Sequence, residues 1–344
     1  MDKRILILGG SGRMGQILAR ELSKDYLVTI ADIRMPDTTT FDEDIQIVKA
    51  DLENYNRIRD LIDDYNLVVG CLPADISYRI AFACADVGKH LVDLSYMPES
   101  PNSLDNIAKA SKSTIIVDAG LAPGLTNLIA GRVWADEGYI HNGKLMVGGM
   151  AADKNAPYGY RLTWSPKDLL AEYTRPAHYI NQGLILTMPA LSGVEEIHIP
   201  GVGVLEAFLT DGLRSLLTMQ DVDCLAEKTL RWPGHIKAAK ELMEKGTFIE
   251  EMQENCSEGD DIVVFHCNLD DRKFTMIEHN KDGLTAMQRT TALTCATFTR
   301  LLSECGSLPY GVLTPEEIGR DVGLYNFMIE TLKSDFGIEI IEEK

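Results

Sequence analysis

The sequence predicts a doubly wound α/β domain with a parallel sheet, followed by a second, α+β domain whose sheet is mostly antiparallel. Short apolar runs alternate with helical segments over the first 118 residues, which is the pattern of strands and crossover helices. The pattern changes at residues 119–124, and several strand-like segments follow. A chain of 344 residues is also longer than most single domains, so two domains are expected.

Six mainly apolar segments in the first part are expected to form the parallel strands, and the first of them is a continuous apolar run, which is typical of a strand buried on both faces. They are residues 5–8, 26–30, 45–48, 67–70, 90–95 and 114–118. Helices are expected between them, at about 17–22, 58–62, 76–87 and 103–110.

The second part mixes strand-like and helical segments. The expected strands are residues 144–150, 197–199, 261–269 and 274–279, and the last two flank a hairpin signal at 270–273. The expected helices are residues 166–170, 212–217, 235–244 and a longer one over 285–303.

A further helix is expected over residues 314–335. Thr314 and Glu317 have the spacing of a capping box, and Pro315 suits the first helical position. Residues 338–341 are expected to add an edge strand.

The formal net charge is −19, and such an acidic surface repels phosphate groups. We therefore expect neither nucleic acid nor an anionic membrane as a partner. Solubility is the simplest interpretation of the charge, and steering of a cationic substrate is the alternative. No apolar run approaches the length of a membrane span.

The seven cysteines are odd in number and form no C-x-x-C pair. A disulfide framework and a metal site are therefore not expected, and a reducing cytoplasm fits this usage.

Residues 10–15 read Gly-Ser-Gly-Arg-Met-Gly and directly follow the first apolar run. In such a motif Gly10 permits the tight turn, Gly12 lets the backbone approach a pyrophosphate, and Gly15 lets helix and strand pack closely. The N-terminus of the following helix offers N–H groups to the phosphates. We therefore expect a Rossmann unit that binds a dinucleotide; a plain strand–turn–helix is the alternative.

Asp32 ends the second strand, twenty residues after Gly12. A carboxylate there accepts hydrogen bonds from a ribose diol and repels a 2′-phosphate, which favours NAD as the cofactor. Arg34 is placed to accommodate a 2′-phosphate, so NADP stays open. A turn-forming aspartate is the alternative interpretation of Asp32.

Loops at the carboxyl ends of parallel strands line the cofactor crevice of such folds. The residues expected to bind the cofactor are therefore Gly10, Ser11, Gly12, Arg13, Met14, Asp32, Ile33, Asp51, Leu52, Cys71, Leu72, Pro73, Ser95 and Leu121. Cys71 is expected to be a packed residue rather than a nucleophile, since nothing nearby in the sequence activates its thiol. The glycines and proline of residues 120–124 indicate a backbone that passes close to a ligand, or an interdomain hinge.

Several longer segments resemble the saccharopine dehydrogenase superfamily, and most closely its archaeal and bacterial L-lysine 6-dehydrogenases. They are residues 92–99, 118–125, 162–169, 172–177, 211–215, 229–235 and 310–316. The resemblance implies a nucleotide-binding domain over 1–124 to which 308–344 return, and a substrate-binding and dimerisation domain over 125–307. It also implies a homodimer, a small amino-acid substrate and oxidation at a carbon–nitrogen bond.

Two positions depart from part of that family. Saccharopine reductases carry Asp at the middle of the Gly-Leu-x-Pro-Gly turn, where this sequence has Ala122, and they place a lysine on the approach to the fifth strand, where Lys89 is one residue off. Both departures favour the lysine 6-dehydrogenases, which share the alanine. The leading hypothesis is NAD-dependent oxidative deamination of the side-chain amine of L-lysine. The alternatives are a saccharopine or carboxynorspermidine dehydrogenase, and an NAD-binding sensor without turnover.

The α-carboxylate of an amino acid calls for a guanidinium group, which grips it through two hydrogen bonds. Arg231 is the first candidate, with Thr229 beside it, and Arg175 is the second. Ala122 is expected to lie at the substrate. A surface or interdomain salt bridge is the alternative role for either arginine.

Asp93, Tyr96 and His235 are the candidates for acid–base catalysis. Asp93 alternates with apolar neighbours, so it either faces a pocket or is a structural carboxylate. Tyr96 is alternatively a residue that stacks on the nicotinamide, and His235 alternatively caps its helix.

Overall fold

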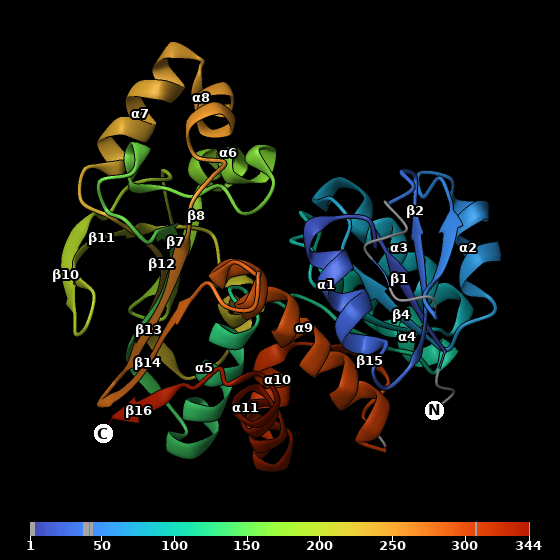
Figure 1. Ribbon diagram of the computed structural model, residues 1–344. Helices are drawn as coiled ribbons and strands as arrows, with labels where there is room; N and C mark the ends of the chain where they lie inside the picture. The colour runs from blue at the N-terminus through green and yellow to red at the C-terminus, as the bar shows by residue number, and fades with distance from the viewer. Residues whose placement is uncertain (1–3, 37–40, 42–43, 307, 344) are drawn as a thin grey trace. The chain divides into compact units, whose positions relative to one another are not determined.

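The computed structural model describes residues 4–36, 41, 44–306 and 308–343, which form two compact units (Figure 1). The first unit runs to Arg132 and resumes over Thr291–Phe336. The second unit is Val133–Thr290 together with the residues from Gly337 on. The chain thus returns to the first unit at Thr291, ahead of residue 308.

The described part of the first unit contains one parallel sheet of seven strands. They are β1 (Arg4–Leu8), β2 (Leu27–Asp32), β3 (Gln46–Lys49), β4 (Leu67–Gly70), β5 (His90–Asp93), β6 (Thr114–Ile116) and β15 (Gly311–Leu313). Their order is β15-β6-β5-β4-β1-β2-β3, with every pair parallel. The strand order reverses between β1 and β4, so the doubly wound fold expected from the sequence is confirmed.

Helices lie on both faces of this sheet: α1 (Arg13–Leu22), α2 (Tyr55–Ile62), α3 (Ala74–Val87) and α4 (Asp105–Ser111). The first unit also contains α10 (Pro315–Arg320), α11 (Val322–Phe336) and most of α5 (Leu125–Glu137) and α9 (Ala286–Glu304). Helices α2, α3 and α4 bury Ile58, Ile80 and Ala108 in one core cluster against the sheet. Because parallel crossovers are right-handed, α1 lies on the opposite face from α3.

The expected helix over 314–335 is present as two helices. The capping box of Thr314 and Glu317 is formed, and the Thr314 N–H donates to Glu317 Oε2 at 2.9 Å. The break falls at Asp321, whose carboxylate accepts the N–H groups of Gly323 and Leu324 at 2.8 and 3.0 Å. Asp321 therefore ends α10 and starts α11, because its side chain caps a new helix.

The second sheet is mixed, with nine strands among the described residues. They are β7 (Ile140–Ala151), β8 (Ala177–Asn181), β9 (Leu184–Met188), β10 (Glu195–Ile199), β11 (Gly203–Leu209), β12 (Val222–Arg231), β13 (Asp261–Leu269), β14 (Arg272–His279) and β16 (Ile341–Glu343). Only β12 and β7 pair in parallel; the other pairs are antiparallel, as expected. The predicted hairpin joins β13 to β14, where Leu269 faces Arg272.

Three helices lie together against this sheet in Figure 1: α6 (Pro166–Thr174), α7 (His235–Lys245) and α8 (Phe248–Asn255). Their apolar side chains share one core cluster, which includes Leu169, Tyr173, Ile236, Phe248 and Met252. This cluster fixes the end of α6 and the start of α7, and so places Tyr173 next to His235.

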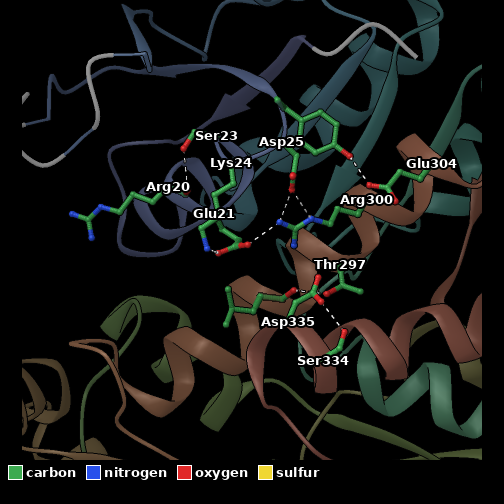
Figure 2. A network of polar contacts seen from close by, with 12 residues as sticks. Arg20, Glu21, Ser23, Lys24, Asp25, Thr297, Arg300, Glu304, Ser334 and Asp335 are labelled. Atoms are coloured by element: carbon green, nitrogen blue, oxygen red, sulfur yellow. Dashed lines mark hydrogen bonds and ion pairs between the residues drawn. The ribbon is translucent and has the colours of Figure 1, made fainter.

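Ion pairs between charged side chains join helix α9 to α1 and the residues that follow it (Figure 2). Arg300 Nη2 lies 2.7 Å from Glu21 Oε1 and 2.9 Å from Asp25 Oδ2. The Tyr26 hydroxyl donates to Glu304 Oε1 at 3.2 Å. The Arg300 and Glu21 side chains are only 8% and 11% exposed, so water screens this ion pair weakly.

Replacing Arg300 by methionine is expected to lower the free energy of unfolding by about 2 kcal/mol, measured by urea denaturation. The change leaves the buried Glu21 carboxylate with only the exposed Lys24 as its cation, and the half-exposed Asp25 limits the loss further. Lys24→Ala is the control, because Lys24 also contacts Glu21 but is 66% exposed, and it should cost about 0.5 kcal/mol or less. Equal losses in the two variants would contradict the buried role of Arg300.

Candidate functional site

The glycine loop between β1 and α1 has no room for side chains at two positions. A Cβ on Gly10 would lie 2.4 Å from Ile30 Cβ, and one on Gly15 would lie 2.3 Å from the carbonyl oxygen of Gly9. Gly12 is exposed, and its N–H donates to that same oxygen at 3.0 Å. No described side chain caps the N-terminus of α1, so this helix end is open to an anion.

The Asp32 carboxylate ties the end of β2 to the glycine loop. Asp32 Oδ2 accepts the Ser11 N–H at 3.1 Å, and Oδ1 accepts the Arg34 N–H at 3.0 Å. The Ser11 hydroxyl donates to the Arg34 carbonyl at 2.8 Å. Each carboxylate oxygen keeps a lone pair for another donor, so Asp32 is both anchored and able to accept a ribose hydroxyl.

The other cofactor candidates follow the carboxyl ends of neighbouring strands, at one edge of the sheet. Ile33, Asp51, Pro73 and Arg13 are exposed, Met14, Cys71 and Leu72 are half-buried, and Leu52, Ser95 and Leu121 are buried. The Ser95 hydroxyl donates to the Leu72 carbonyl at 2.8 Å, which joins the loops after β5 and β4. Burial raises the pKa of the Cys71 thiol, so it is held as an unreactive thiol.

Asp93, at the end of β5, is completely enclosed. Its Oδ1 accepts the Ser95 N–H at 2.7 Å, while Oδ2 has no hydrogen-bond partner among the described residues. A Cβ on Gly70 would lie 2.0 Å from Oδ2, so β4 needs a glycine here. Burial raises the pKa of Asp93 to about 7, with Asp118 adding to the rise.

Tyr96 and Ala122 are half-buried, in the segments that follow β5 and β6. Both segments leave the sheet at the edge where the glycine loop lies, because these strands are parallel. Asp93, Tyr96 and Ala122 therefore belong to the first unit with the cofactor candidates.

The second unit contains a buried chain of hydrogen bonds through three side chains. Arg231 Nε donates to Tyr173 Oη at 2.8 Å, and Tyr173 Oη lies 2.8 Å from His235 Nε2. His235 Nδ1 lies 2.8 Å from the Tyr158 carbonyl oxygen, which can only accept. His235 is therefore protonated on Nδ1, and Tyr173 donates to Nε2.

Both nitrogens of His235 are thus engaged within the fold. Burial and the nearby Arg231 lower the pKa of His235 to about 3, so the ring is neutral at physiological pH. A neutral ring with no unengaged nitrogen orients the Tyr173 hydroxyl rather than exchanging protons with a substrate. The contacts of His235 are thus those of a positioning residue.

The Arg231 guanidinium is 3% exposed and lies between two aromatic rings. Its central carbon is 5.1 Å from the Tyr160 ring centroid and 5.7 Å from that of Tyr173. Its Nη1 donates to the Leu230 carbonyl, and Nη2 lies 3.7 Å from Glu172 Oε2. The buried cation therefore has a matching anion beside it, as an enclosed charge requires.

Thr229 belongs to the same network, since its hydroxyl donates to Glu172 Oε1 at 2.7 Å. Strand β12 places Glu227, Thr229 and Arg231 on one face, because side chains two residues apart in a strand point the same way. Arg175 is half-buried at the residue that follows α6.

Sequence reasoning missed five residues of this network: Tyr160, Glu172, Tyr173, Thr210 and Glu227. The polar residues at 227, 229 and 231 alternate with other residues, and this alternation could have indicated a shared face. It does so only if the segment is first assigned as a strand.

No group of three or more His, Cys, Asp or Glu side chains in the described ranges is arranged to hold a metal ion. The seven cysteines are free thiols. Within the part of the chain that the structure describes, no helix has the length and apolarity needed to cross a membrane.

Two family models match most of the chain. Residues 5–116 match the saccharopine dehydrogenase NADP binding domain, and residues 120–269 match the saccharopine dehydrogenase C-terminal domain. The matches meet at residues 116–120, where the sequence pattern changes.

Individual proteins with similar sequences have names that agree with these family models. Mitochondrial alpha-aminoadipic semialdehyde synthase of Rattus norvegicus is 24% identical over 71% of this chain and 28% of the relative. Saccharopine dehydrogenase [NADP(+), L-glutamate-forming] of Saccharomyces cerevisiae is 22% identical over 74% of this chain and 60% of the relative. The chain thus spans less than two thirds of the length of either protein.

A solved structure has the same fold over its whole length. The apo saccharopine dehydrogenase (L-Glu forming) from Saccharomyces cerevisiae superposes with a TM-score of 0.80 at 18% identity, covering 99% of both chains. Both domains of the fold and the matches along the sequence thus lead to one conclusion: the chain belongs to the saccharopine dehydrogenase family.

Proposed function

We propose that this protein is a nicotinamide-dependent dehydrogenase that oxidises a carbon–nitrogen bond of an amino acid, with the side-chain amine of L-lysine as its substrate. The observation that carries the proposal is the pairing of Arg231 with Glu172 inside the second unit. A guanidinium beside a carboxylate complements the carboxylate and ammonium groups of an amino acid. The relatives named above include saccharopine dehydrogenases, which supports the same class of reaction.

The first unit fits a dinucleotide. The crowded positions at Gly10 and Gly15, the uncapped start of α1 and the anchored Asp32 carboxylate are what a pyrophosphate and an adenosine ribose require. A bound nicotinamide would supply the acceptor for the hydride that leaves the substrate carbon.

The oxidised amine must be neutral, although a lysine amine has a pKa of about 10.4 in water. An apolar surrounding favours the neutral form. We assign the acid–base role to Tyr96, which is half-buried, whereas Asp93 is enclosed and holds the Ser95 turn and His235 orients Tyr173. The predicted homodimer and cytoplasmic location stay predictions.

Lysine is proposed over saccharopine because of Ala122, where saccharopine reductases carry Asp. Saccharopine holds an additional carboxylate, which would call for another guanidinium. Arg175 and Arg214, both half-buried in the second unit, are the candidates for that contact. The support for saccharopine is the family match and the names of the relatives.

The deciding experiment is a substrate panel. L-lysine, saccharopine, ornithine and carboxynorspermidine are each supplied with NAD and with NADP, and reduction of the nicotinamide is followed by absorbance. We expect reduction with L-lysine; turnover of another amine without turnover of lysine would overturn the lysine assignment. Tight NAD binding by calorimetry with no turnover of any amine would indicate a sensor.

Asp32→Asn is expected to lower the preference for NAD over NADP by about 10- to 100-fold, which is the worth of a hydrogen bond to a charged group. The amide keeps an acceptor for the loop but removes the charge that repels a 2′-phosphate. The measurement is the ratio of kcat/KM for the two cofactors. Asp63→Asn is the control, because its carboxylate is 82% exposed and is not among the cofactor candidates; an unchanged ratio in Asp32→Asn would contradict the assignment.

A further inference from the structure

Four side chains of the second unit form a buried row that joins two carboxyl groups. The Thr229 hydroxyl donates to Glu172 Oε1 at 2.7 Å, and the Thr210 and Thr229 hydroxyl oxygens are 2.9 Å apart. Thr210 is in turn hydrogen-bonded to Glu227 Oε2. Thr210, Glu227 and Thr229 are 3%, 5% and 4% exposed, so bulk water contributes little to the row.

If both carboxyl groups were ionised, the row would lack one of the hydrogens that its hydrogen bonds need. Three contacts require three hydrogens, and the two threonine hydroxyls supply only two. The third must therefore come from a carboxyl group at one end of the row, either Glu172 or Glu227.

Several charged groups decide which end holds the hydrogen. Glu172 Oε2 lies 3.7 Å from Arg231 Nη2, so a cation stands at that end of the row. Glu227 is enclosed against Gly212, where an added Cβ would lie 2.6 Å from its carboxyl carbon. The pKa of Glu227 is raised to about 8, mainly by burial and also by the Glu172 and Asp211 carboxylates, while the Thr210 hydroxyl and Arg231 oppose the rise. The Cys267 thiol on β13 is a further titratable group near Glu227.

We propose that Glu227 is a protonated positioning residue, which acts through Thr210 and Thr229 to hold the Glu172 carboxylate against Arg231. The hydrogen bonds then run in one direction, from the Glu227 carboxyl to Thr210, from Thr210 to Thr229, and from Thr229 to Glu172. Glu172 Oε2, which has no hydrogen-bond partner among the described residues, is left facing the guanidinium. The protonation of Glu227 is inferred from the three hydrogen-bond contacts of the row, whereas its effect on turnover rests on the function proposed above.

Loss of the Glu227 proton would disrupt the row. Thr210 would then turn its hydrogen toward the Glu227 carboxylate, and the two threonine oxygens at 2.9 Å would have no hydrogen between them. The threonines would separate, and Glu172 would lose part of its support. Because the folded pKa of Glu227 lies above its ordinary 4.5, its contribution to stability is full below about pH 4.5 and is lost as pH rises through about 8.

The test of protonation is infrared spectroscopy of the whole protein. At pH 6.5 both Asp93 and Glu227 contribute to the carbonyl band of protonated carboxylic acids. We expect one component of this band to be lost above about pH 8, to be absent in Glu227→Gln and to be retained in Asp93→Asn. Glu195→Gln is the matched control, since Glu195 forms ion pairs with Lys144 and Lys228 on the same sheet and should leave the band unchanged. A spectrum at pH 6.5 that is identical in wild type and Glu227→Gln would overturn the proposal.

The test of positioning is a set of Thr210 variants. Thr210→Val removes the relay, so KM for the amino acid should rise about tenfold, the worth of one hydrogen bond, with a smaller change in kcat. Thr210→Ser keeps the hydroxyl and should restore KM. In the wild type, KM should rise as pH passes about 8 and Glu227 loses its proton. In Glu227→Gln the amide donates to Thr210 at every pH, so this rise in KM should be absent. Equal KM in Thr210→Val and Thr210→Ser would overturn the positioning role. A normal infrared band with no turnover of any amine would overturn the proposed function and support the protonated row.

Discussion

Replacing Arg231 by methionine is expected to lower the free energy of unfolding by about 3–5 kcal/mol, the usual cost of removing one partner from a buried ion pair. The change leaves the Glu172 carboxylate without its cation and takes the Nε donor from Tyr173 Oη. Methionine keeps much of the apolar volume between the Tyr160 and Tyr173 rings, so the loss reports mainly on charge. Urea unfolding at constant pH measures it.

Two further variants isolate the cause. Adding Glu172→Gln to Arg231→Met should recover at least half of the lost stability, because no uncompensated charge is then buried. Lys144→Met removes a cation from the same sheet, but its partner Glu195 and its own side chain are both more than one third exposed. It should cost about 1 kcal/mol or less. Equal losses in Arg231→Met and Lys144→Met would contradict the buried pair.

Asp93→Asn is expected to remove a large loss of stability that the wild type undergoes as pH rises. The folded pKa of Asp93 is about 7, above its ordinary 3.8, because the enclosed site disfavours the charge. Its stabilising contribution is therefore fully present below about pH 3.8 and disappears as pH rises through 7. The difference between the two pKa values is worth about 4 kcal/mol.

The measurement is urea unfolding of the wild type and the variant between pH 4 and pH 8. The difference in their free energies of unfolding should change by about 4 kcal/mol across this range, in favour of the variant at pH 8. Glu227 is common to both proteins, so its own titration cancels. Asp63→Asn replaces a carboxylate that is 82% exposed and should leave the pH dependence unchanged. Parallel curves for the wild type and Asp93→Asn would refute the protonated Asp93.

The first sheet was predictable because short, mainly apolar segments alternate regularly with helical segments and the glycine motif fixes its start. Strand β15 was not, since three residues carry too little pattern. Helix α5 was missed because its apolar residues lie on all sides, as in a buried helix, and so show no amphipathic stripe.

The substrate half was harder to predict. Strand β12 was not expected, although it carries Thr229 and Arg231, because its polar residues at 227, 229 and 231 face a buried network rather than solvent. Arg231, Thr229 and His235 were nominated for separate roles, and the structure brings them into one network through Tyr173 and Glu172. The partners that enclose them come from distant segments. Glu172 is 59 residues from Arg231, and spacing alone does not indicate such a contact.

The placement of β15 and β16 also affects the order in which the protein is made. Strand β15 completes the edge of the first sheet beside β6, about 200 residues upstream, and β16 covers the edge of the second sheet beside β14. During synthesis both sheets expose an unpaired edge until residues 311–343 have left the ribosome. A nascent chain stalled before Gly311 is therefore expected to present two open edges and to need chaperone protection against aggregation.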